Sequence, residues 1–308
     1  MEKDYRKEGE EMEKKKRKYS RTDKVILGIG FTILGLFVLS IAIPIIYVVL
    51  ASFMDPTVLN NQGLSFNIKD WTLDAYRRVL ENEMIWRGFL NSFLYSLAFT
   101  VISVFVTLLA AYPLSKKEFV GRKFFNIIFL ITMFFGGGMI PTFLLYKQLG
   151  LTNSFGVYVI PGMVSAFNML VIRTYMNGIS DSLEESAQLD GAGYTTIFLK
   201  IYSPLCKPVY ATVALFVAVG QWNSWFDAML YNRMNSNLTT LQYELMKLLS
   251  SVTNQGTSVE AMKNAAGSVT PTSVRAAATI ITMLPIICIY PFLQKYFVAG
   301  LTLGGVKE

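Results

Sequence analysis

The segment Glu185–Pro208 reads ESAQLDGAGYTTIFLKIYSPLCKP and lies between two strongly apolar stretches of the chain. Its first half is polar, and it contains Gly191 and Gly193, which permit a sharp turn after a helix. The segment therefore predicts two short helices joined by a turn and held at the surface of an apolar body. A rigid polar pair of this kind suits partner docking, because one contact can move both flanking stretches together.

Local signals predict where the two helices begin and end. Ser182 and Glu185 have the spacing of a capping box, with the serine as N-cap and the glutamate at the third helical position. This spacing predicts a first helix over about Leu183–Leu189. A second helix is expected over Tyr194–Ile201, and Pro204 is expected to open the next apolar stretch.

The composition of the chain is that of a membrane protein. Its 308 residues are 53% hydrophobic and 16% charged, with a mean hydropathy of +0.41, so polar residues are too few to cover a soluble surface. Six charge-free runs are long enough for helices that cross a bilayer core of about 30 Å. They are Val25–Met54, Gly88–Ser115, Phe124–Tyr146, Gln148–Ile172, Pro208–Phe226 and Ala276–Gln294. We expect an all-α integral membrane protein with six transmembrane helices, because only helices satisfy every backbone group of such runs.

The distribution of positive charge predicts the orientation. Six spans place both termini on one side, and 19 of the 28 Lys and Arg residues then lie on that side, which is expected to be the cytoplasm. The chain is divided into a basic arm over 1–24, a transmembrane domain over 25–298 and a cytoplasmic tail over 299–308. The transmembrane domain includes a cytoplasmic loop, 173–207, and an extracytoplasmic loop, 227–275.

Two internal features modify the plain helical bundle. Three glycines and a proline in Phe135–Pro141 should weaken the third run or let another helix approach closely, so a local break that lines a cavity is expected there. In loop 227–275, leucines at 241, 245, 248 and 249 recur at helical spacing and predict a short amphipathic helix.

Several classes of site are excluded by residue content. The chain has no histidine, which removes histidine-based catalysis and metal ligation. Its two cysteines, Cys206 and Cys288, lie in or beside apolar runs, are expected to be buried, and give no disulfide framework. The basic cluster over 14–18 precedes a charge-free run and is read as a membrane flank, not a nucleic-acid site. The chain also lacks the Gly-rich phosphate loop of ATPases, so an ATP-driven process would need another polypeptide.

The quoted segment resembles the EAA loop of bacterial ABC importer permeases, in which Glu-Ala-Ala is followed by a glycine and then by Ile-x-Leu-Pro. The matching residues are Glu185, Ser186, Ala187, Gly191, Ile201 and Pro204. Ser186 and Ser203 are departures from the pattern, and both are small changes. The likeness extends over roughly residues 20–308 and includes Asn91-Ser92, Phe135–Gly138, Trp222-Asn223 and the tail over 299–307. It is strongest to the carbohydrate branch: the tail resembles maltose-type permeases, and the Gly-Gly-Gly span resembles Gram-positive permeases for complex oligosaccharides, the lipoprotein-associated and rhamnogalacturonan-type group.

The resemblance implies the six-helix fold of a type I importer and a set of partners. Two non-identical permeases would form the pathway, two ATPase subunits would bind the coupling loops, and an extracytoplasmic sugar-binding lipoprotein would deliver an oligosaccharide. ATP and Mg²⁺ would be bound by the partner subunits, and this chain would hold no cofactor and catalyse no reaction. The implied location is the bacterial cell membrane.

The same resemblance gives candidate site residues. Those for ATPase coupling are Glu185, Ser186, Ala187, Asp190, Gly191, Tyr194 and Phe198. Those for an ATPase-contacting tail are Gly304, Gly305, Val306 and Lys307. Those for the substrate pathway are Gly137, Trp222, Asn223, Trp225 and Asp227.

Simpler interpretations stay open for some of these residues. Glu185 could serve the capping box alone, Asp190 could only cap a turn, and Trp222 and Trp225 could be interfacial anchors. Loop 227–275 is expected to reach toward the binding protein, and the alternative is a lid over the pathway. For the whole chain, an ion-coupled secondary carrier and a membrane enzyme are the alternative classes. A carrier usually needs an ionisable residue within the spans, and the six runs contain none. An enzyme is disfavoured because the chain has no histidine and no paired carboxylates within the spans.

Overall fold

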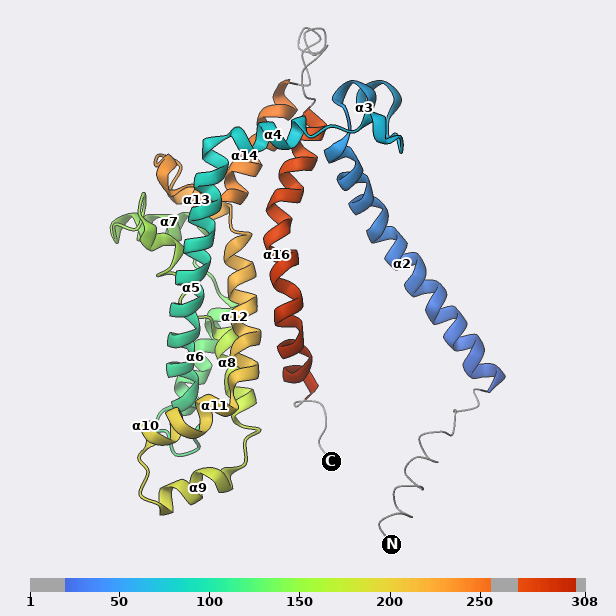
Figure 1. Ribbon diagram of the computed structural model, residues 1–308. Coiled ribbons are helices and arrows are strands. Elements are labelled where there is room, and N and C mark those ends of the chain that lie inside the picture. Colours follow the sequence, from blue (N-terminus) through green and yellow to red (C-terminus); the bar gives the residue numbers. More distant parts are fainter. Residues whose placement is uncertain (1–19, 256–270, 303–308) are drawn as a thin grey trace. The chain divides into compact units, whose positions relative to one another are not determined.

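The computed structural model describes residues 20–255 and 271–302 and divides the chain into two compact units, 1–50 and 51–308 (Figure 1). Most of the basic arm, residues 256–270 of loop 227–275 and the tail residues Gly304–Lys307 therefore lie outside the described residues. Unit 1 is described by one helix, α2 (Arg21–Phe53), whose last three residues belong to unit 2. It includes Pro44 and nearly all of the first charge-free run.

Unit 2 is built from helices. In the described residues the sole β-type pairing is one isolated bridge, between Met54 and Trp71. The α-helices are α3 (Pro56–Gln62), α4 (Asp74–Glu81), α5 (Glu83–Ser115), α6 (Arg122–Phe134), α7 (Met139–Gln148), α8 (Ala166–Met176), α9 (Asp181–Leu189), α10 (Tyr194–Ile197), α11 (Ser203–Leu205), α12 (Lys207–Trp222), α13 (Phe226–Tyr231), α14 (Leu241–Gln255) and α16 (Pro271–Thr302). The shorter turns are η1 (Ile68–Asp70), η2 (Phe155–Tyr158), the π-helical η3 (Phe198–Tyr202) and η4 (Ser236–Leu238).

The expected all-α membrane fold is confirmed, but the count of six spans is not. By length and composition, three helices of the described chain can cross a membrane, namely α2, α5 and α16. Two bent pairs raise the number to five if each pair forms one span. The pair α6 and α7 bends by 115°, and the helical stretch Tyr194–Leu205 bends by 74° where it meets α12.

The expected break at the glycine run is present. The segment between α6 and α7 is Phe135–Gly138, and Gly138 has a φ of +80°, a left-handed value that L side chains rarely adopt. Gly137, the candidate pathway residue, lies in this exposed break.

The prediction that the fourth charge-free run, Gln148–Ile172, forms one continuous helix is wrong. This run contains the end of α7, the turn η2 and the start of α8, and α8 has 11 residues, about 16 Å of helix. Gly150 and Asn153 have left-handed φ values of +69° and +53°. Asn232 then holds the loop by accepting from the Ser154 amide and donating to its carbonyl. Apolar composition alone did not show these turns.

The buried core of unit 2 joins α5 to its neighbours. One cluster packs α5, α8 and α12 together and includes Met169, Ile172 and Cys206. A second joins α4, α5, α12, α14 and α16, and the predicted amphipathic helix α14 buries Leu241 and Leu245 in it. Cys206 is buried as expected, whereas Cys288 on α16 is exposed, which corrects that prediction.

Small residues of α5 fix the start of α14. A Cβ on Gly88 would lie 3.0 Å from the Leu241 nitrogen, so a larger residue would push the α14 backbone away by a few tenths of an ångström. One turn later, the Ser92 hydroxyl accepts from that same nitrogen at 2.9 Å. Asn91 donates to the carbonyls of Asn237 and Thr239. Asn91-Ser92 lies within α5, which starts at Glu83.

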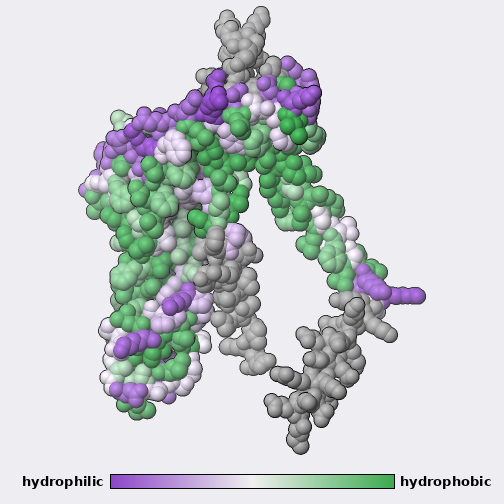
Figure 2. All heavy atoms as spheres, viewed as in Figure 1, coloured by the Kyte–Doolittle hydropathy of each residue, from purple (hydrophilic) through white to green (hydrophobic). Residues whose placement is uncertain are grey.

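The ends of unit 2 differ from its middle in the hydropathy of their side chains. Figure 2 shows apolar side chains over the length of α5 and hydrophilic side chains gathered at the end that carries α4 and α14. The opposite end carries α9, α10 and α11 (Figure 1). The polar Glu185–Pro208 segment therefore begins at one end of an apolar helical body, as its sequence predicts.

Candidate functional site

The helix α9 begins earlier than its sequence signals predict. Its first residue is Asp181, so Ser182 is inside the helix, and the expected Ser182–Glu185 capping box is wrong. Ser180 occupies the N-cap position without a side-chain hydrogen bond to the helix, and its hydroxyl instead bonds to that of Ser182 at 2.7 Å. Asp181 and Glu184 stand in the first turn, where negative charge interacts favourably with the helix dipole.

The end of α9 is the glycine turn that the sequence predicts. Gly191 has a φ of +82° and donates from its nitrogen to the Gln188 carbonyl at 2.9 Å. The Ala192 nitrogen donates to the Ala187 carbonyl at 2.9 Å. These two bonds form a Schellman motif, which satisfies carbonyls at the helix end. A Cβ on Gly191 would meet no atom within 4 Å, so the need for glycine here comes from φ alone.

The second helical stretch is longer than predicted and contains a π-helical segment. α10, η3 and α11 follow one another without a gap from Tyr194 to Leu205. Pro204 lies in α11 and does not open the next apolar helix. α12 instead begins at Lys207, with Pro208 in its first turn, after the 74° bend.

A nearly buried ion pair attaches α9 to the end of α5. The Lys116 ammonium pairs with the Glu184 carboxylate, and the two side chains are 11% and 12% exposed. The Tyr202 hydroxyl donates to the same carboxylate at 2.8 Å. The Lys116 nitrogen also lies 3.7 Å from the centre of the Tyr202 ring and 4.7 Å from that of Tyr112, within range of cation–π attraction. Lys116 and Glu184 were not among the candidate residues from the sequence. The sequence hinted at them only through two adjacent pairs of like charge, Lys116-Lys117 and Glu184-Glu185.

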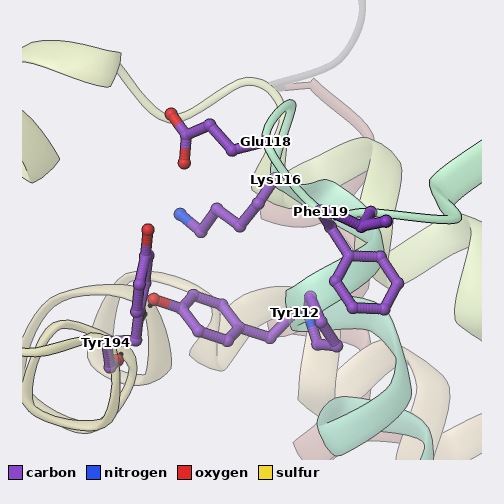
Figure 3. A pocket seen from close by; sticks show the side chains of 7 residues that line it. Tyr112, Lys116, Glu118, Phe119 and Tyr194 are labelled. Carbon is purple, nitrogen blue, oxygen red and sulfur yellow. Dashed lines mark hydrogen bonds between the residues drawn. The ribbon is translucent and has the colours of Figure 1, made fainter.

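Exposed contacts strengthen the same attachment. Lys117 pairs with Asp181 at 2.9 Å, and its hydrogen bond and charge lower the pKa of the Asp181 carboxyl. The Tyr112 hydroxyl donates to the Tyr194 carbonyl at 3.2 Å. Figure 3 shows Tyr112 and Lys116 pointing toward Tyr194 around a hollow of about 460 Å³. The turn and both helices of the segment are thus held against the end of α5.

The candidate coupling residues divide between two faces. Glu185, Ser186, Asp190, Gly191 and Tyr194 are exposed. Leu189, on the same surface, is 90% exposed. The remaining two candidates face inward.

Ala187 and Phe198 pack against the α5–α8–α12 core, and the Phe198 ring lies 4.8 Å from that of Tyr112. They support the loop from beneath and leave the outer face for a partner. The structure thus separates one glutamate for internal attachment, Glu184, from one that faces outward, Glu185. In the described part of the chain no hydrogen bond or ion pair reaches the Glu185 carboxylate.

The candidate pathway residues after α12 have different environments. Trp222 is 7% exposed, packs edge-on against Phe89 at 5.7 Å between ring centres, and donates from its indole nitrogen to the Thr282 carbonyl. It joins α12 to α5 and α16, and its burial does not favour direct sugar contact. Asn223 is exposed, and Trp225 is half-buried and packs edge-on against Phe226.

Asp227 lies in a hollow of about 560 Å³ formed by α5, α8, α12 and α13. Its carboxylate accepts from the Ser224 hydroxyl at 3.2 Å, and burial raises the pKa of the Asp227 carboxyl above its usual value. Asn168 and Gln221, which the sequence did not single out, also line this hollow. Neither residue carries a local motif, so only their convergence in the fold reveals them.

Known proteins resemble the chain over most of its length, although no family model matches it. The polygalacturonan/rhamnogalacturonan transport system permease protein YtcP of Bacillus subtilis is 34% identical over 279 residues, which cover 90% of this chain and 96% of that protein. The protein LplC of Bacillus subtilis is 37% identical over 268 residues, which cover 86% and 89%.

Solved structures agree with these relatives. A crystal structure of a bacterial ABC transporter involved in the import of the acidic polysaccharide alginate matches with a TM-score of 0.81 and 33% identity, covering 91% of this chain and 99% of that one. A second alginate ABC transporter structure, in complex with an alginate pentasaccharide-bound periplasmic protein, matches with a TM-score of 0.58 and 15% identity, a likeness of fold alone.

Proposed function

The chain belongs to the family of carbohydrate ABC importer permeases, and from this premise we propose that it forms one half of an oligosaccharide pathway driven by separate ATPase subunits. It is a transport subunit and an integral protein of the cell membrane, not an enzyme. Family membership excludes the two alternative classes that the sequence left open, the ion-coupled carrier and the membrane enzyme. The proposed termini lie in the cytoplasm, and the proposed partners are a second homologous permease, two ATPase subunits and a sugar-binding lipoprotein.

One observation carries the proposal for coupling. The α9–α10 segment presents exposed Glu185, Leu189 and Tyr194 outward while Glu184 ties it inward to Lys116. A partner that pushes on the outer face would therefore move the end of α5 together with α12, which continues from the same segment. ATP and Mg²⁺ would be bound on that partner.

The substrate is proposed to be an oligosaccharide. Relatives of this chain are named for polygalacturonan or rhamnogalacturonan, arabinooligosaccharides and maltodextrin. The proposed direction is inward, from a binding protein outside the cell, and loop 227–275 would face that protein.

The docking proposal is tested with one substitution and a matched control. Leu189→Asp places a charge on the exposed docking face, and Met234→Asp does so at an equally exposed apolar residue, 87% accessible, far from the segment in sequence and outside it. With all subunits co-expressed, Leu189→Asp should reduce ATPase co-purification and ATP-driven uptake, and Met234→Asp should leave co-purification unchanged. Equal co-purification of the ATPase with both variants would contradict the docking role.

A further inference from the structure

The hollow that contains Asp227 has the composition of a sugar-binding surface. Its walls include three phenylalanines from three places in the chain, Phe99 on α5, Phe167 on α8 and Phe216 on α12. Ring faces of this kind suit the apolar faces of pyranose and furanose rings, and ligand sites commonly combine such walls with a few polar groups. Its volume, about 560 Å³, is in the range of sites for small ligands.

Two amide side chains supply polar groups. Gln221 is 8% exposed, and its Nε2 atom has no hydrogen-bond partner among the described residues. Asn168, also 8% exposed, lies on the α8 wall of the same hollow. A buried amide without a partner is costly, and a sugar hydroxyl can satisfy it as donor or acceptor. These uncharged amides can form hydrogen bonds with the hydroxyl groups of a sugar.

The charge of the hollow points to the kind of sugar. Of the described residues that line it, Asp227 is the only charged one, and none is Lys or Arg. A carboxylate accepts hydrogen bonds from sugar hydroxyls, but it repels the carboxylates of uronic acids. Binding a polyanionic chain would need positive charge in its place.

We propose that this hollow is the part of the sugar path contributed by this chain, and that it selects uncharged oligosaccharides against those carrying carboxylates. The inference rests on the proposed transport function and narrows its substrate class. Similar proteins have names that specify polygalacturonan or the acidic polysaccharide alginate, so acidic sugars are the class against which the proposal is tested.

The test compares neutral and acidic oligosaccharides on the assembled complex. Arabinan, galactan and polygalacturonan digests of matched length are offered together, and mass spectrometry counts what the complex retains in nanodiscs and what it imports into proteoliposomes. The wild-type complex should prefer the neutral digests. Asp227→Asn should raise the ratio of acidic to neutral sugar by on the order of tenfold, since it removes one repulsive charge close to the ligand.

Two further variants make the result specific. Gln221→Leu should lower retention of neutral sugar by about fivefold, because one hydrogen bond to the ligand is lost, and should leave the acidic-to-neutral ratio unchanged. Asp74→Asn removes an exposed carboxylate on α4, outside the hollow, and should change neither quantity.

The outcomes separate the two levels of the proposal. Preference for acidic digests, or an Asp227→Asn ratio equal to wild type, would overturn the selection of uncharged sugars while transport stands. Absence of ATP-dependent uptake of every digest by the assembled wild-type complex would instead overturn the transport function and this inference with it.

Discussion

Removing the charge of Glu184 should detach α9 from α5 and destabilise the protein. The Lys116 and Glu184 side chains are 11% and 12% exposed, so Glu184→Gln leaves a nearly buried ammonium without its carboxylate. Breaking one partner of a buried pair typically costs about 3–5 kcal/mol. The tyrosine rings beside Lys116 keep a cation–π attraction of about 1–2 kcal/mol for the unpaired ammonium, so we expect a net loss of about 1–4 kcal/mol.

The double variant Lys116→Met/Glu184→Leu tests whether the loss of stability comes from the interaction between the two charges. Replacing both charges with apolar side chains of similar size is often nearly neutral, so the double variant should be more stable than either single one. The melting temperature of the purified complex and its sugar-stimulated ATPase activity are measured for wild type, Lys116→Met, Glu184→Leu and the double variant. The two single variants should have the lowest melting temperatures and the weakest stimulation.

Glu185→Gln is the matched control, because it changes the adjacent but exposed carboxylate. It should keep the wild-type melting temperature, since surface substitutions usually change stability by less than about 0.5 kcal/mol, while lowering ATPase stimulation. The reasoning would be refuted by a Glu184→Gln protein as stable as wild type. It would equally be refuted by single-variant losses that simply add in the double variant, since coupled residues do not behave so.

Three further outcomes are expected. Gly191→Val forces a β-branched residue into a φ of +82°, at a cost of about 1–2 kcal/mol or more; the protein should stay in the membrane but lose ATP-driven uptake, whereas Gly193→Val, at a φ of −75°, should retain it. Gly88→Val should displace the start of α14 from α5, because its Cβ would lie 3.0 Å from the Leu241 nitrogen, and a melting temperature equal to wild type would show that the contact is unimportant. Deleting 301–308 should weaken ATPase co-purification without changing membrane insertion, and unchanged co-purification would reject a tail contact.

The sequence by itself determined the class of the protein and its local turns. Charge-free runs must leave water, so an all-α membrane protein followed from them before any contact was known. The glycine run before Pro141 predicted the break between α6 and α7, and Gly191 predicted the turn after α9. The EAA-like residues around Gly191 also predicted the family. Each of these signals is local, because backbone freedom and solvation act on a few neighbouring residues.

Only the tertiary structure decided which groups meet. Lys116 and Glu184 are 68 residues apart, and nothing local distinguishes Glu184 from Glu185, so their opposite roles depend on where α9 lies against α5. Hydropathy could not show that the run after Gln148 turns through left-handed residues, because apolar content reports exclusion from water and not helical continuity. The hollow around Asp227 draws its walls from four helices, and its charge is a property of their packing. Local chemistry thus determines the helices and turns, and long-range packing determines which side chains form the hollow.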